Sequence, residues 1–194
     1  MTVTADPKSK TYGTDNPELT YTASGLFGSD TLTGTLATTA TKTSDVGEYD
    51  ITVGTLANSN YTVTFAGAKL TITKAASSVT KAPEAVSGLI FNGDVQALVT
   101  AGTANGGTIQ YRLSQNESYS TAIPTGKNAK TYTVYYKVVG DANHIDTDVQ
   151  SVVVKIGQLA VAEPTVSGTY TGKAHLKLAT GKTAANGTTV AGAT

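Results

Sequence analysis

The sequence predicts an all-β protein made of tandem small modules. Apolar and polar side chains alternate with a period of two in most segments, and short runs of Gly, Asn, Asp and Ser separate these segments. No stretch of ten or more residues has the apolar spacing of a helix. The chain is 39% hydrophobic, enough for a packed core, and only 14% charged, against about 25% in an average soluble protein.

The first module is predicted to span residues 2–74. Its inward faces are the alternating apolar positions, which are Leu19, Tyr21, Ala23, Tyr49, Ile51, Val53, Tyr61, Val63, Phe65, Leu70 and Ile72. The connections "GSD", "SDVG", "ANSN" and "AGA" are turn sequences, because their residues accept positive φ or bond to their own backbone. The pattern leaves a sandwich-like and a β-grasp-like packing of this small, mostly-strand module both open.

A linker and a second module follow. Residues 75–82, "AASSVTKA", are small and polar without a pattern, which favours a linker. The second module is predicted over residues 80–156, with strands in "GLIF", "VQALVTA", "TIQYRL", "TYTVYYKVVG" and "QSVVVKI". In "TYTVYYKV", Tyr132, Val134, Tyr136 and Val138 share one face, which is expected to point inward. Because one module's exit leads directly into the next module's entry, we expect the modules to line up end to end.

Residues 157–194 are predicted to be the truncated start of a further repeat. "APEAVSGLIFNGDVQALVTAGTANGGT" (82–108) resembles "AEPTVSGTYTGKAHLKLATGKTAANGT" (162–188), and such self-similarity is typical of arrays of like modules. An incomplete module leaves strand edges open, and open edges pair with other chains. We expect this tail to be disordered or to self-associate through intermolecular strand pairing.

Charge and composition exclude several classes of partner. Lys+Arg and Asp+Glu both number 14, so the chain lacks the basic field of a nucleic-acid or anionic-membrane binder. The absence of cysteine excludes disulfides, thiolate metal sites and cysteine nucleophiles. No apolar run reaches the roughly 20 residues of a membrane span, so membrane insertion is not expected. Met1 leads directly into strand-like sequence without a signal core, as expected of a piece cut from a longer chain.

The first module closely resembles the MBG domain of YGX type, a module repeated in bacterial adhesin-like surface proteins. The resemblance covers nearly all of residues 2–74. Its matching residues are Lys10-Thr11-Tyr12-Gly13, Asn16-Pro17, Leu19, Ser24-Gly25-Leu26, Asp30, Leu32-Thr33-Gly34, Val46-Gly47-Glu48-Tyr49 and Asn60-Tyr61.

The second module resembles bacterial Ig-like repeats through "GTIQY", "TAIP" and "TYTVYYKV", with Lys130 standing where a glycine is expected. The resemblance implies an Ig-like antiparallel sandwich. Together the two resemblances imply a secreted or surface-anchored adhesin-like protein. They transfer no catalytic or binding residue to this chain.

The loop "GDANHIDTD" (140–148) holds weak candidates for a metal site, Asp141, Asp146 and Asp148. Calcium takes six to eight oxygen ligands, and three carboxylates on one loop supply some of them. The loop lacks the glycine and closing glutamate of an EF-hand, and its aspartates are equally suited to bonding their own backbone. We therefore predict no metal and no cofactor.

Catalysis is not predicted either. The two histidines, His144 and His175, lie in different modules, and no nucleophile, base and acid converge on either of them. No strand clearly points a lysine inward, so an intramolecular Lys–Asn crosslink is not expected. Tyr49 and Tyr132 each begin an alternating strand after a turn. They are candidates for a tyrosine corner, with an ordinary core tyrosine as the equal alternative.

The sequence thus favours a non-catalytic stalk or spacer in an extracellular bacterial adhesin-like surface protein. The alternative is a binding module for a host glycan or protein, which would be held by inter-strand loops such as 114–124 or 140–148. An enzyme would need a deep pocket with converging polar groups, and the sequence gives no sign of one.

Overall fold

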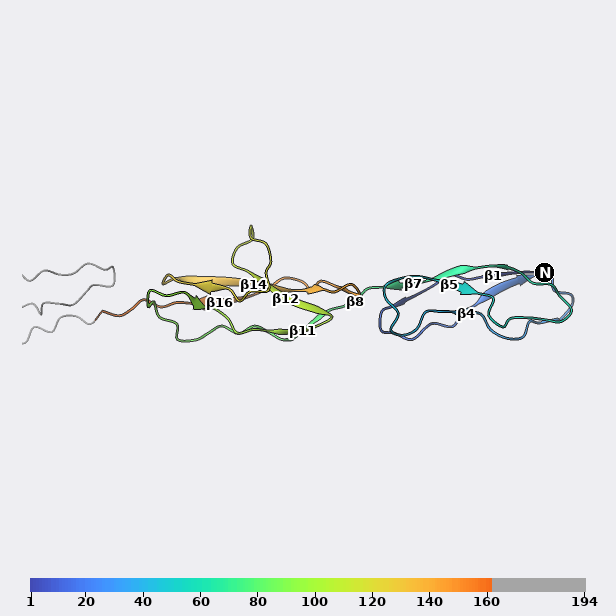
Figure 1. Ribbon diagram of the computed structural model, residues 1–194, viewed down its shortest axis with the longest axis horizontal. Coiled ribbons are helices and arrows are strands. Elements are labelled where there is room, and N and C mark those ends of the chain that lie inside the picture. Colours follow the sequence, from blue (N-terminus) through green and yellow to red (C-terminus); the bar gives the residue numbers. More distant parts are fainter. Residues whose placement is uncertain (162–194) are drawn as a thin grey trace, which may run out of the picture.

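The structure is a computed structural model that describes residues 1–161. Sixteen strands and no helix form within these residues, so the prediction of an all-β fold is confirmed. Buried apolar side chains form two separate clusters, one within residues 3–72 and the other within residues 98–156. We call residues 1–74 module one and residues 75–161 module two. The modules follow each other along the long axis of the molecule (Figure 1).

Module one consists of two small sheets. Its strands are β1 (Thr2–Ala5), β2 (Lys8–Thr11), β3 (Tyr21–Ser24), β4 (Ala37–Thr38), β5 (Gly47–Thr52), β6 (Thr64–Ala66) and β7 (Ala68–Thr73). The orders are β3-β1-β6 in one sheet and β2-β7-β5-β4 in the other. The pairs β1–β6 and β2–β7 are parallel, whereas the other neighbours are antiparallel, so both sheets are mixed. These two parallel pairs bring the first strands of the module against its last two strands.

The expected alternation is present in the strands that form the core of module one. Leu70 and Ile72 on β7 are at most 1% exposed, and Ile51 on the neighbouring β5 is 2% exposed. Val3 on β1 is fully buried in the same cluster, so both sheets contribute to one core. Burial of this apolar surface, at about 25 cal/mol per Å², is the main stabilising contribution.

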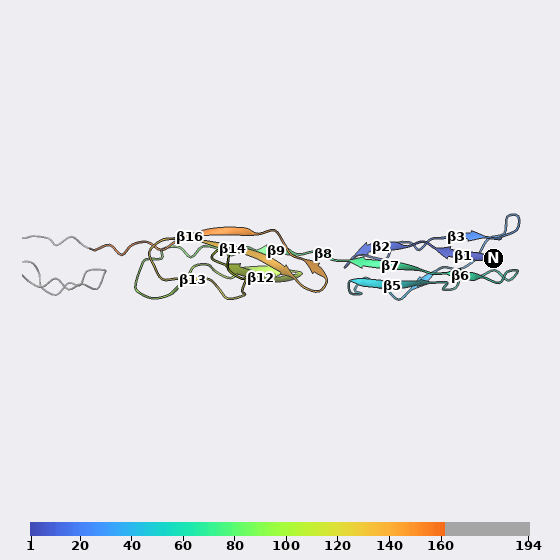
Figure 2. The ribbon, with the colours of Figure 1, turned by 90° about the horizontal axis from the view of Figure 1, so that it is seen from above.

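Module two is built around one antiparallel sheet, with the order β12-β14-β16. Its strands are β8 (Ala75–Ala76), β9 (Ser78–Lys81), β10 (Gln96–Ala97), β11 (Thr103–Asn105), β12 (Gly107–Arg112), β13 (Thr125–Gly126), β14 (Thr131–Gly140), β15 (His144–Ile145) and β16 (Gln150–Lys155). Three two-stranded pairs, β8–β15, β9–β11 and β10–β13, complete the module. β8 lies at the end of module two that is nearest to module one (Figure 2). Along β14, Val134, Tyr136 and Val138 are buried, which confirms the predicted inward face.

The prediction that residues 75–82 form a linker is wrong, because most of this segment lies in two strands. Ala75–Ala76 pair in parallel with β15, and Ser78–Lys81 pair with β11. Small side chains produce no periodic signal, but sheet hydrogen bonds use only the backbone and form without one. Lys74 alone separates β7 from β8, so the chain passes between modules almost without leaving a strand.

Both candidate tyrosine corners form the hydrogen bond that defines them. The Tyr49 hydroxyl donates to the carbonyl of Asp45 at 2.9 Å, and the Tyr132 hydroxyl donates to the carbonyl of Asn128 at 3.0 Å. Each acceptor lies four residues upstream of its tyrosine. The corner interpretation is therefore confirmed over that of an ordinary core tyrosine.

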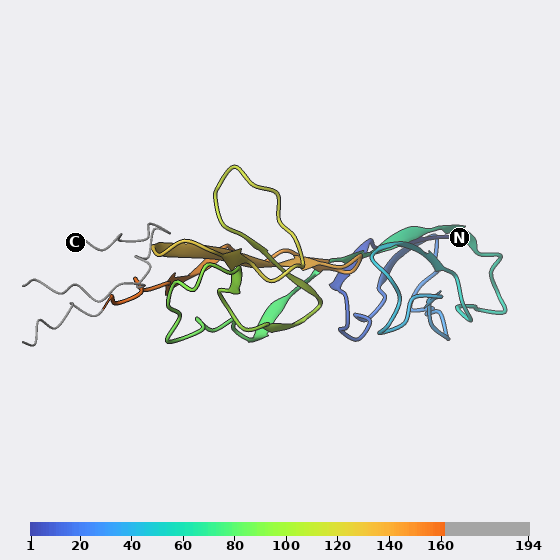
Figure 3. The ribbon, with the colours of Figure 1, turned by 60° about the vertical axis from the view of Figure 1, so that its left-hand side comes forward.

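The predictions about the tail concern residues outside the described part of the chain. The repeat at 162–188, its order or self-association, and His175 all fall there. Of the segment 157–194, the structure describes residues 157–161, which leave module two at the end opposite to module one (Figure 3).

Candidate functional site: the joint between the modules

The loop 140–148, which carries the aspartates considered for a metal site, lies at the end of module two that meets module one. Asn143 in this loop bridges the modules with its side chain. Its Nδ2 donates to Oδ1 of Asp45 at 2.7 Å, and its Oδ1 accepts from the backbone N of Val46 at 2.9 Å. One amide thus uses both its donor and its acceptor on the turn that precedes β5.

Backbone bonds within module two hold the entering chain at the same place. The N of Ala75 donates to the carbonyl of Asn143 at 2.9 Å, next to the parallel pair of β8 and β15. Lys74 Nζ lies 3.4 Å from the carbonyl of Asp141. The residues that join the modules are therefore held by the loop 140–148, which is itself part of module two.

An aromatic contact completes the joint. The rings of Tyr12 and His144 meet edge to face, with centroids 5.4 Å apart. Tyr12 directly follows β2, and its N donates to the carbonyl of Thr73 at 2.9 Å, which fixes it beside the chain exit. The His144 side chain is only 15% exposed. A Cβ on Gly106 would come within 2.5 Å of the His144 ring, so the ring occupies space that only glycine leaves open.

Two of the three aspartates, Asp141 and Asp146, form hydrogen bonds with other residues of module two. Oδ1 of Asp141 lies 2.7 Å from Nδ1 of His144 and accepts from the N of Asn143 at 2.8 Å. The hydrogen bond from His144 is the main reason why the pKa of Asp141 is lowered. Asp146 accepts from Lys137 Nζ at 2.5 Å and from the N of Gly140 at 2.9 Å, and the Lys137 contact chiefly lowers its pKa.

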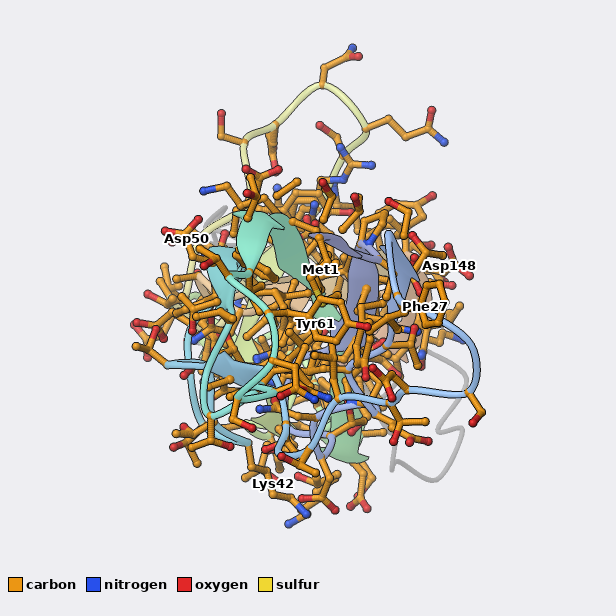
Figure 4. All side chains as sticks on the ribbon, turned by 90° about the vertical axis from the view of Figure 1, so that its right-hand side faces the viewer. Met1, Phe27, Lys42, Asp50, Tyr61 and Asp148 are labelled. Carbon is orange, nitrogen blue, oxygen red and sulfur yellow. The ribbon has the colours of Figure 1, made fainter. Side chains whose placement is uncertain are left out.

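These carboxylates are not brought together as a ligand set. Asp141 faces the joint, Asp146 faces Lys137 on β14, and Asp148 lies at the periphery in the end-on view (Figure 4). Residues 1–161 contain no group of three His, Cys, Asp or Glu side chains placed to hold a metal ion. The backbone bonds of Asp141 and Asp146 match the alternative in which such residues shape their own loop.

Lys10 is a structural residue that the sequence analysis missed. It is 8% exposed, and its Nζ donates to the carbonyls of Thr14 at 3.0 Å and Thr41 at 2.6 Å. The expectation that no lysine points inward is therefore wrong. The alternation in "KSKT" does not predict that Lys10 points inward, because both faces of this strand are polar.

The joint itself also escaped sequence analysis, because its partners are far apart in the chain. Asp45 and Asn143 are 98 residues apart, and both lie in turns without periodicity. The one sequence feature that points to the joint is weak: Asn143 and His144 stand next to each other in a loop otherwise rich in aspartate.

The loop considered for ligand binding at 114–124 projects in its first part from the side of module two, between β12 and β13 (Figure 1). The Tyr119 ring contacts two cations, the Arg112 guanidinium at 4.5 Å and Lys137 Nζ at 5.1 Å from its centroid. These contacts fix the base of the loop on the outer face of the sheet. The tip residues 115–118 are exposed.

Residues 1–71 match the family model of the MBG domain (YGX type). The matched region ends inside β7 and covers the strands that form the core of module one. Neither a curated protein nor a solved structure matches the chain. No helix in residues 1–161 is long and apolar enough to cross a membrane.

Proposed function

We propose that this chain is a non-catalytic structural segment, a stalk or spacer within an extracellular bacterial adhesin-like surface protein. The observation that carries the proposal is the joint, where Asn143 and His144 of module two contact the turn before β5 and Tyr12 of module one. A flexible linker would let the modules move independently. A spacer that keeps a distal part away from a surface needs a defined direction instead, and the joint supplies contacts that resist bending.

Several features of the chain support this proposal. The first is the match of residues 1–71 to the family model of the MBG domain (YGX type). The antiparallel sheet β12-β14-β16 and the Tyr132 corner support an Ig-like repeat in module two. The balanced charge and the threonine-rich strand faces suit a surface that stays solvated and requires no cofactor.

Distance measurements between spin labels test the rigidity of the joint. The chain has no cysteine, so Thr52→Cys on β5 and Ser151→Cys on β16, both exposed, give one label on each module. We expect a single narrow distance distribution by pulsed electron paramagnetic resonance. Asn143→Ala combined with Tyr12→Ala should broaden it, because these changes remove the bridging amide and the aromatic contact.

Asn116→Ala is the matched control, because Asn116 is an exposed asparagine in the projecting loop, away from the joint. It should leave the distribution narrow. A distribution in the labelled protein with an intact joint that is as broad as that of the joint variant would exclude a rigid spacer.

A second candidate function is the binding of a host glycan or protein by the loop 114–124. The observation that favours it is the base of this loop, where the Tyr119 ring contacts Arg112 and Lys137 while residues 115–118 stay exposed. Binding to a glycan array, or capture of a host protein, that is lost when residues 115–118 are replaced by Gly-Ser would support it. Binding that persists after this replacement would exclude the loop.

A further inference from the structure

The end of module one that points away from the joint presents an exposed aromatic side chain. Phe27 is 86% exposed, more than any other large hydrophobic residue that the structure describes. Figure 4 looks onto this end, where Phe27, Tyr61 and Met1 lie together. Phe27 does not contribute to the core of module one. Burial of this ring against a partner would remove apolar surface from water, which is favourable.

The turn that carries Phe27 is held in place. The N of Phe27 donates to the Tyr61 hydroxyl at 2.9 Å, and that hydroxyl donates to Oδ2 of Asp30 at 2.6 Å. Asp30 closes the turn with a backbone bond to the Phe27 carbonyl at 3.2 Å. Gly25 and Gly28, at φ of +82° and +60°, allow the tight bends on either side. The backbone that carries the ring is therefore held in place, which lowers the entropy lost on binding.

The opposite end of the molecule has a recess of matching character. Phe91, Ala129, Gln158 and Leu159 line a recess of about 300 Å³ where the chain leaves module two. Leu159 at its edge is 51% exposed. A cavity of about 150 Å³ accommodates a benzene ring, so this recess is large enough for a phenyl group.

We propose that Phe27 of one chain enters the Phe91–Leu159 recess of a second copy, head to tail. The joint within one chain already uses this kind of contact, since the Tyr12 ring at the end of module one packs on a ring of module two. The formal net charge of zero means that no long-range repulsion opposes the approach of two copies. The two surfaces differ, so the contact does not close on itself and adds copies in line.

The association is tested by sedimentation of the full chain over a concentration series. The series extends to about 1 mM, because an interface with a single aromatic anchor is small and its affinity is expected to be weak. We expect the average mass to rise with concentration. Phe27→Asp and Leu159→Asp should each raise the dissociation constant at least tenfold, while circular dichroism shows that both variants remain folded. Val153→Asp is the control, because Val153 is 60% exposed on β16 and lies away from both ends.

Mixing the two variants tests the head-to-tail arrangement itself. Phe27→Asp retains an intact recess, and Leu159→Asp retains an intact Phe27, so the mixture should form dimers that grow no further. Monomers only in this mixture would overturn the proposal. So would a wild-type chain that stays monomeric at about 1 mM. Loss of association in Val153→Asp but not in Phe27→Asp would assign self-association to the β16 edge and also overturn it.

Discussion

At the scale of single residues, the buried ammonium of Lys10 is the clearest test of what holds module one together. Lys10→Met keeps the apolar stem and removes the charge together with both hydrogen bonds to Thr14 and Thr41. Each hydrogen bond to a charged group is worth about 1.5–3 kcal/mol, so we expect the free energy of unfolding to fall by about that amount or more. Urea denaturation at pH 7 measures it.

Lys42→Met is the matched control for Lys10. Lys42 pairs with Asp15 at 3.4 Å, but both side chains are more than half exposed. Such pairs contribute about 1 kcal/mol or less. If both variants lost the same free energy of unfolding, the hydrogen bonds of Lys10 would contribute no more to stability than an exposed ion pair.

The titration of Asp141 gives a prediction for the joint. Its hydrogen bond with His144 lowers its pKa in the folded protein. A carboxyl group with a lowered folded pKa stabilises the protein above its unfolded pKa, which is about 3.9, and this contribution is lost as the pH falls through the folded value. Thermal unfolding should therefore show a gap between the wild type and Asp141→Asn at pH 7 that closes towards pH 2. A gap that is constant with pH would contradict this assignment.

At the scale of elements, the turn between β11 and β12 is fitted to the ring of His144. Gly106 has φ of +75°, and an added Cβ would lie 2.5 Å from that ring. Gly106→Ala therefore incurs both backbone strain and a steric clash. We expect a loss of about 1–3 kcal/mol or more in chemical denaturation. Gly13→Ala isolates the first effect, because Gly13 has φ of +82° and no atom within 4 Å of an added Cβ. The clash explanation fails if both variants lose the same stability.

Strand alternation made the core predictable from sequence. The inward face of β14 was found because Val134, Tyr136 and Val138 alternate with more polar neighbours, and a sheet with one buried face requires such alternation. The pairs β8–β15 and β9–β11 were not found, because small side chains in "AASSVTK" carry no face preference. Lys10 was missed for the same physical reason, since Lys8, Ser9 and Lys10 offer no apolar contrast.

The joint could not be predicted from local patterns. The joint is held by single hydrogen bonds between turns, such as the bond between Asn143 and Asp45. In the sequence alone, an asparagine in a turn is equally suited to a hydrogen bond with its own backbone. The metal hypothesis for Asp141, Asp146 and Asp148 concerns the same loop and rests on closeness in sequence, which does not bring carboxylates together in space. The structure directs Asp141 and Asp146 to different partners, while the bridging role falls to the neutral residue between them.

At the scale of the whole molecule, the joint should make the stability of one module depend on the folding of the other. When module one unfolds, module two loses both bonds of the Asn143 side chain and the contact of His144 with Tyr12. Two such bonds contribute about 1–3 kcal/mol in total. Destabilising module one alone should therefore lower the unfolding midpoint of module two as well.

A double-mutant cycle read by nuclear magnetic resonance measures this coupling. Resonances of Ile51 report on the core of module one, and those of Val138 report on the core of module two. In urea, Lys10→Met should shift the midpoint of Val138 to lower concentration, because module two then unfolds without its neighbour. With Asn143→Ala also present, Lys10→Met should move only Ile51, since the bridge that transmits the effect is gone. A Val138 midpoint that ignores Lys10→Met in both backgrounds would mean that the modules touch at the joint without stabilising each other, and the stiffness proposed for the stalk would then need another source.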